Sequence, residues 1–118
     1  MSQDDNASKQ NEILLVLTNL PDQDSAQRLA QTLIAEHAAA CINILAACTS
    51  IYRWQSKIES AAEIPLLIKT TRSAYPRLQE LIRSSHPYEL PEIIAIPVSA
   101  GLPAYLEWVT NETQPERE

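Results

Sequence analysis

The sequence has little glycine, no phenylalanine and few cysteines. Gly101 is the only glycine among 118 residues, so turns must rely on Asn, Asp, Ser and Pro. The two cysteines, Cys41 and Cys48, form no CxxC motif. On one continuous strand their side chains would point to opposite faces about 23 Å apart, which is too far for a disulfide. We therefore expect both to be reduced, buried thiols.

Positive charge is also scarce. Nine Lys and Arg stand against 15 Asp and Glu, a formal net charge of −6, which opposes binding to nucleic acids and anionic membranes. No apolar run approaches the roughly 20 residues of a membrane span, and the polar segment Met1–Asn11 has no signal-peptide core. These features predict a cytoplasmic protein with no nucleic-acid or membrane partner.

Motifs that would indicate catalysis are missing as well. The chain has no HExxH, no GxSxG, no Walker loop and no Cys-His nucleophile pair with an obvious orienting group. We therefore expect no enzymatic activity.

The first half of the chain reads as a strand, a helix and a long strand. The apolar run Glu12–Thr18 predicts a strand buried on both faces. A helical period begins at Asp24, which with Gln27 suits a capping box. Residues 40–55 have β-branched and aromatic residues without Gly or Pro, which predicts one long strand.

The second half predicts a returning strand, a helix, a strand and a last helix. Residues 58–71 return beside the long strand as an antiparallel hairpin, with a bulge or an unpaired edge at Pro65. Ser73 can cap the next helix, and residues 92–98 form the fourth strand. We expect the last helix to bury one face, formed by Leu102, Tyr105, Leu106 and Val109.

This order predicts an α+β fold, a ferredoxin-like βαββαβ sandwich with an extra C-terminal helix and a long central β-hairpin. The chain length suits one domain. We expect that domain to span residues 12–112, between a disordered N-terminal tail at 1–11 and a C-terminal tail at 113–118.

The central hairpin is longer than the body that should carry it. A compact domain of this length is about 35 Å across, whereas a strand of 16 residues extends about 50 Å. The projecting part would expose Ile51, Tyr52, Trp54 and Ile58. An exposed strand edge of this kind invites pairing with another chain, so we expect a homo-oligomer.

Several side chains could bind a ligand, and each has a structural alternative. Tyr52 and Trp54 share one strand face and could line a pocket or form an oligomer contact. Lys69 could bind an anion or form a salt bridge with Glu63 or Glu92.

The segment HPYELPE, residues 86–92, could hold a metal or serve as a stiff connector. The residue before each proline favours an extended conformation, so the preceding helix should end near His86. Fully extended, the segment would place His86 and Glu92 about 20 Å apart. One copy could then supply both metal ligands only if Tyr88–Leu90 folded back, although neighbouring subunits could bring them together.

Four ordered motifs, AACINILAACTSIYRW, LLIKTT, HPYELPEIIAIPV and YLEWV, resemble the divalent-cation tolerance protein CutA family over Ile13–Val109. The resemblance implies a cytoplasmic homotrimer joined through the hairpins, similar in shape to PII signalling proteins and associated with tolerance of copper and other divalent cations. It also implies no established catalytic activity. The recurrent inter-subunit cleft residues of the family correspond to Tyr52, Trp54, Lys69, His86, Tyr88 and Glu92.

The resemblance leaves three hypotheses about the ligand. Thr18 and Ser85 stand where some relatives have a cysteine and a histidine, which leaves His86 and Glu92 to bind Cu(II) or another divalent cation weakly at subunit boundaries. No tightly bound cofactor is expected. Alternatively the cleft binds a small anionic metabolite near Lys69, or the trimer is a scaffold without a ligand. The sequence identifies no downstream protein partner.

Overall fold

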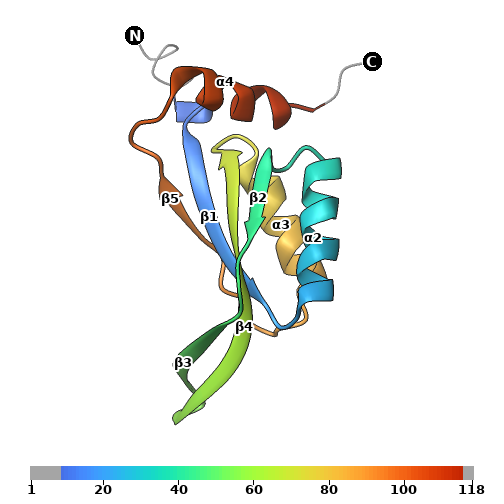
Figure 1. Ribbon diagram of the computed structural model, residues 1–118, viewed down its shortest axis with the longest axis vertical. Helices are drawn as coiled ribbons and strands as arrows, with labels where there is room; N and C mark the ends of the chain where they lie inside the picture. Colours follow the sequence, from blue (N-terminus) through green and yellow to red (C-terminus); the bar gives the residue numbers. More distant parts are fainter. Residues whose placement is uncertain (1–8, 116–118) are drawn as a thin grey trace.

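The computed structural model describes residues 9–115 as five strands and three helices (Figure 1). In chain order these are β1 (Ile13–Leu20), α2 (Gln23–Ala35), β2 (Cys41–Ile44), β3 (Cys48–Trp54), β4 (Lys57–Thr71), α3 (Tyr75–Ser85), β5 (Ile94–Pro97) and α4 (Pro103–Glu112). Among these described residues, no helix is long and apolar enough to cross a membrane.

The strands form one antiparallel sheet in the order β2-β4-β1-β5, and β3 pairs with the outer part of β4. If β2 and β3 are counted as one interrupted strand, this is the strand order of a ferredoxin-like sandwich. Helices α2 and α3 cover one face of the sheet, and α4 lies at the end opposite the hairpin (Figure 1). The predicted fold class is confirmed.

The core lies between the sheet and helices α2 and α3. Successive side chains of a strand point to opposite faces, and β1 sends Leu14, Val16, Thr18 and Leu20 toward these helices. They meet the buried stripes of the two helices, which are spaced three or four residues apart as an amphipathic helix requires. The stripes are Ala26, Leu29 and Leu33 in α2, and Leu78 and Ile82 in α3.

Both helices of the core begin differently from the prediction. The N-cap of α2 is Asp22 rather than Asp24, because the Asp22 carboxylate accepts a hydrogen bond from the Ser25 N–H at 2.8 Å. That bond lowers the pKa of Asp22. In α3 the N-cap is Ala74 instead of Ser73, and its N–H donates to the Thr71 hydroxyl at 3.3 Å.

The predicted long strand is two strands, and Pro65 explains the break. Ile44 faces Leu66 and Cys48 faces Glu63. Residues 45–47 therefore lie opposite only residues 64–65, so the segment between β2 and β3 bulges while β4 continues without a break. The Pro65 carbonyl accepts from the Leu45 N–H at 2.9 Å. Proline has no N–H to return that bond, so the ladder is interrupted opposite it.

The hairpin projects from the body as the length argument predicts. The molecule measures 50 × 30 × 25 Å, and β3 with the outer part of β4, residues 48–63, forms an arm below the helices (Figure 1). Ile51 and Ile58 on this arm are 73% and 71% exposed. Cys48, at the start of the arm, is free and exposed, so the expectation that both thiols are buried is wrong for it.

Helix α4 covers only the end of the second sheet face. Of its four predicted buried residues only Val109 is buried, and Leu102 is 71% exposed. The expected buried face is therefore wrong, because the sheet beneath α4 ends near Ile13 and Thr71. The Thr71 and Thr113 hydroxyls lie 3.3 Å apart under the helix.

The packed chain extends slightly beyond the predicted domain limits. Thr113 is buried, and the Gln10 carbonyl accepts a hydrogen bond from the Ser73 N–H at 3.1 Å. Lys9–Asn11 and Thr113 therefore contact the body where tails were expected. The rest of both predicted tails, apart from residues 114–115, lies outside the described residues.

Replacing Thr18 with valine should stabilise the protein. Thr18 is 1% exposed, and its hydroxyl is the only buried side-chain polar atom without a partner in the described part of the chain. An unsatisfied buried polar group costs about 1–3 kcal/mol, so urea unfolding should show a higher free energy of unfolding for Thr18→Val.

The matched control is Thr70→Val. The Thr70 hydroxyl is equally buried but donates to the Ala38 carbonyl at 2.7 Å. Its loss leaves that acceptor unpaired, so this variant should be less stable than wild type. Equal destabilisation by both substitutions would show that the Thr18 hydroxyl has a partner after all.

Candidate functional site

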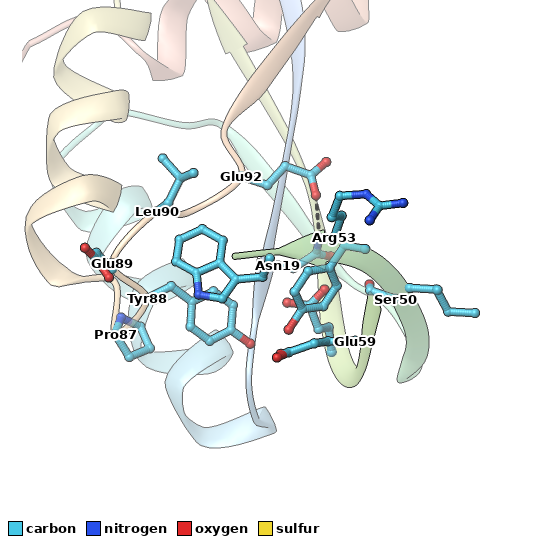
Figure 2. Close-up of a pocket in the computed structure, with 13 residues that line it drawn as sticks. Asn19, Ser50, Arg53, Glu59, Pro87, Tyr88, Glu89, Leu90 and Glu92 are labelled. Carbon is cyan, nitrogen blue, oxygen red and sulfur yellow. Dashed lines mark hydrogen bonds between the residues drawn. The ribbon is translucent and has the colours of Figure 1, made fainter. Parts of the chain in front are cut away.

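The main cavity lies where the arm meets the loop after α3 (Figure 2). We call this loop, residues 86–92, the connector loop. The cavity has a volume of about 850 Å³, within the range of small-molecule sites. Its lining comes from the arm, the connector loop and the end of β1: Asn19, Ser50, Ile51, Tyr52, Arg53, Trp54, Glu59, Glu63, Pro87, Tyr88, Glu89, Leu90 and Glu92.

The strand register explains why the arm presents these residues together. The turn Gln55-Ser56, with both residues at positive φ, pairs Trp54 with Lys57 and Tyr52 with Glu59. Directly opposed residues of an antiparallel pair share one face of the sheet. Tyr52, Trp54, Glu59 and Glu63 therefore lie on one side of the arm, and all four line the cavity.

Tyr88 lies between the two walls of the cavity. Figure 2 shows its ring with Glu59 on the arm side and Glu89 on the loop side. Burial, followed by a hydrogen bond to the Glu63 carboxylate and its negative charge, raises the pKa of Tyr88 to about 12. The phenol therefore stays neutral at physiological pH and joins the connector loop to the arm.

His86 is buried beneath the cavity and fully engaged with the protein. Its Nδ1 accepts the Tyr88 N–H at 3.1 Å, so the ring proton is on Nε2, which donates to the Asn19 carbonyl at 2.6 Å. The His86 and Tyr88 rings also pack with centroids 4.8 Å apart. As predicted, α3 ends at Ser85 and His86 follows in an extended conformation.

Glu92 and His86 both form hydrogen bonds with Asn19. The Asn19 side-chain amide donates to Glu92 at 2.8 Å (Figure 2), while His86 binds the Asn19 carbonyl. The connector loop is bent over residues 87–90 rather than extended, so the predicted separation of about 20 Å is wrong. Both side chains reach one point of β1, where they bind Asn19.

Lys69 is not part of this cavity within one chain. It lies in β4 opposite Cys41, donates to the Asn43 side chain, and places its Nζ 3.9 Å from Cys41 Sγ. Neither Glu63 nor Glu92, its predicted salt-bridge partners, is bonded to it. The structure therefore groups Tyr52, Trp54, Tyr88 and Glu92, and separates Lys69 from them.

The charge of the cavity favours a cation. Four carboxylates, Glu59, Glu63, Glu89 and Glu92, line it against one guanidinium, that of Arg53. With the other residues between 9 and 115 these carboxylates form no ion pair. Glu59, Glu63 and Glu89 were missed as site residues, although the arm register that follows from a two-residue turn would have placed Glu59 beside Tyr52.

The predicted pair of metal ligands does not fit a metal ion in this arrangement. Both ring nitrogens of His86 are used in hydrogen bonds, and a metal would have to displace one of them. Residues 9–115 contain no group of three His, Cys, Asp or Glu side chains placed to hold a metal ion. The groups that remain accessible are carboxylate oxygens, which suit hard cations.

Tyr88 should ionise far above the ordinary range for tyrosine. Its pKa is raised from 10.0 to about 12, so the neutral form favours the folded state. That contribution to stability is complete below pH 10 and is lost as the pH rises through 12. The ultraviolet difference titration between wild type and Tyr88→Phe should show one phenol with a midpoint near pH 12. A midpoint near pH 10 would contradict the partly buried bond to Glu63.

Comparison with known proteins supports one family. The family model described as CutA1 divalent ion tolerance protein matches residues 14–112. The divalent-cation tolerance protein CutA of Thermus thermophilus is 42% identical over 99 residues, covering 84% of this chain and 96% of that protein. The chloroplastic protein CutA of Arabidopsis thaliana is 37% identical over 86% of this chain, which spans only 56% of that longer protein.

Solved structures agree with this comparison. The crystal structure of CutA from Xylella fastidiosa superposes with a TM-score of 0.85 at 42% identity, covering 87% of this chain and 99% of that chain. The chain therefore belongs to the CutA1 divalent ion tolerance family.

Proposed function

We propose that this protein acts in the tolerance of divalent cations as a homotrimer whose acidic cavity attracts the cation. The observation that carries the proposal is the lining itself, in which four carboxylates face one guanidinium. The divalent ion tolerance family to which the chain belongs supports the same cation class. The proposal includes no catalytic reaction, and the cytoplasm stays the predicted location.

The uncovered face of the sheet supports self-association. Five apolar side chains from three strands lie on this face, next to the polar pair Lys69 and Asn43: Leu15, Leu17, Leu67, Ile94 and Ile96. Ile94 and Ile96 are each nearly half exposed. Apolar sheet faces of this kind are normally packed against another layer, and a second copy would supply that layer. The proposed number of three subunits comes from the family resemblance.

Charge on this face should break the assembly. Ile96→Glu places a carboxylate where a second copy would pack, and burying an unpaired charge is costly. Sedimentation equilibrium should give about three times the chain mass of 13.2 kDa for wild type and the monomer mass for this variant.

The matched control is Ile34→Glu. Ile34 is 40% exposed, close to the 47% of Ile96, but lies in α2 on the other face of the molecule. This variant should keep the wild-type mass. A monomeric wild-type protein would contradict the trimer.

Cation binding should depend on the cavity carboxylates rather than on His86. His86 is a positioning residue here, because its ring ties Tyr88 to β1. Carboxylate oxygens alone bind divalent cations weakly, with dissociation constants on the order of 1 mM in loosely built sites. The alternative predicted from the sequence is copper binding through His86 and Glu92. It requires the His86 ring to give up its hydrogen bond to the Asn19 carbonyl.

Calorimetric titration with Mn(II) and Cu(II) separates the two sites. Glu59→Gln should weaken Mn(II) binding by roughly threefold to tenfold through lost charge attraction. His86→Asn should lower the free energy of unfolding by about 1–3 kcal/mol and weaken Mn(II) binding less than Glu59→Gln does, because the ring supports one wall but supplies no ligand. The control Glu107→Gln removes one exposed carboxylate of α4, outside the cavity, and should change nothing. Cu(II) binding that His86→Asn abolishes without unfolding would favour the site predicted from the sequence.

A further inference from the structure

The cavity contains more than an inorganic cation needs. Its walls include three aromatic side chains, Tyr52, Trp54 and Tyr88, among the carboxylates. A metal ion is held by oxygen atoms converging on one point at about 2.0–2.6 Å, and it gains nothing from ring faces in such a site. An organic ammonium group is instead attracted both to carboxylates and to aromatic rings.

The carboxylates are distributed over two walls. Glu59 and Glu63 belong to the arm, and Glu89 and Glu92 belong to the connector loop. In Figure 2 Glu59 and Glu89 lie on opposite sides of Tyr88. This division suits a ligand with positive charge at two separated points better than a single point charge. A carbon chain between those points would lie against the aromatic side chains.

The size of the cavity also fits such a ligand. Its volume of about 850 Å³ greatly exceeds the roughly 30 Å³ that one water molecule occupies in the liquid. It falls within the range of about 300–1,000 Å³ that is typical of sites for small organic molecules. The cavity can therefore hold a small organic molecule as well as a bare ion.

We propose that the cavity binds an aliphatic diamine or polyamine, with its ammonium groups at the carboxylates of the two walls and its methylene chain against Tyr52, Trp54 and Tyr88. The proposal rests on the cavity described above as the cation site, but it does not require that the cavity bind a metal ion. Tyr88 contributes a neutral ring, because its phenol remains protonated in the bond to Glu63.

Trp54 can report binding directly. The chain has two tryptophans, Trp54 and Trp108, and only Trp54 lines the cavity. The variant Trp108→Phe keeps Trp54 as the single tryptophan. Titration of this full-length variant with 1,4-diaminobutane and with spermidine should change its fluorescence and saturate. The uncharged analogue 1,4-butanediol should have no effect, and added NaCl should weaken the response because it screens exposed charges.

Variants of both walls test the assignment. In the Trp108→Phe background, Glu59→Gln and Glu89→Gln should each weaken diamine binding by about fivefold, the effect of losing roughly 1 kcal/mol of attraction. Tyr88→Leu should weaken it by a similar factor of about five through the lost ring face. The control Glu107→Gln makes the same change of net charge outside the cavity and should shift the affinity by less than about twofold.

The outcomes distinguish this proposal from the one on divalent cations. Mn(II) binding without any response to diamines overturns the present inference and leaves the acidic cavity as a metal site. A diamine response that Glu107→Gln weakens as much as Glu59→Gln also overturns it, because binding would then follow net charge alone. Saturable diamine binding that needs both walls supports it, whether or not Mn(II) binds.

Discussion

The backbone hydrogen bonding of β4 holds the body and the arm together. This strand of 15 residues pairs with β1 along the whole of that strand, with β2 in the body and with β3 in the arm. Parts of β4 contribute to both faces of the sheet, to the arm and to one wall of the cavity. Pro65 sits at the transition, where the missing N–H ends the pairing with β2 and allows the facing chain to bulge into β3.

The second wall of the cavity depends on a short chain of contacts through Asn19. The His86 ring fixes the start of the connector loop, and the Glu92 carboxylate fixes its end, each by a hydrogen bond to the same residue of β1. A buried imidazole that joins a backbone N–H to a carbonyl is satisfied without a ligand. The same geometry that makes His86 a good support makes it a poor metal ligand, and it leaves the cavity chemistry to carboxylates and aromatic rings.

Local patterns and the family resemblance together predicted the fold, but they failed wherever a distant partner decides the outcome. The stripe in α2 identified part of the core, because burial of those residues follows from their own period, whereas β1, predicted to be buried on both faces, is fully buried only on the face toward the helices. The break in the long strand could not be read from residues 45–47 themselves, since its cause is Pro65 on the neighbouring strand. The prediction of a buried face for α4 failed for the same reason, because the pattern of an amphipathic helix does not indicate how far the sheet beneath it extends.

Site residues show the same division. Tyr52, Trp54, Tyr88 and Glu92 were predicted through the resemblance and do line one cavity, whereas Lys69 lies elsewhere in the chain. The distance argument for His86 and Glu92 assumed an extended connector loop, because a proline restrains the residue before it but does not dictate the bends that follow. Glu59 and Glu63 were overlooked because isolated carboxylates on a strand carry no motif until the turn fixes their register.

The arm aromatics Tyr52 and Trp54 lie on one face of the arm and line the cavity, which favours the pocket-wall interpretation for them. Tyr52, Trp54, Glu59 and Glu63 lie on the side that faces the connector loop, while Ile58 lies at an alternate position with most of its side chain exposed. A strand can present a ligand on one face and a second copy on the other, since successive residues alternate. Self-association through Ile58 on the other face would hold the arm in place and leave Tyr52, Trp54, Glu59 and Glu63 facing the connector loop. It would therefore fix the distance between the two carboxylate walls. Binding of a diamine, whose two ammonium groups are a set distance apart, would depend on that distance.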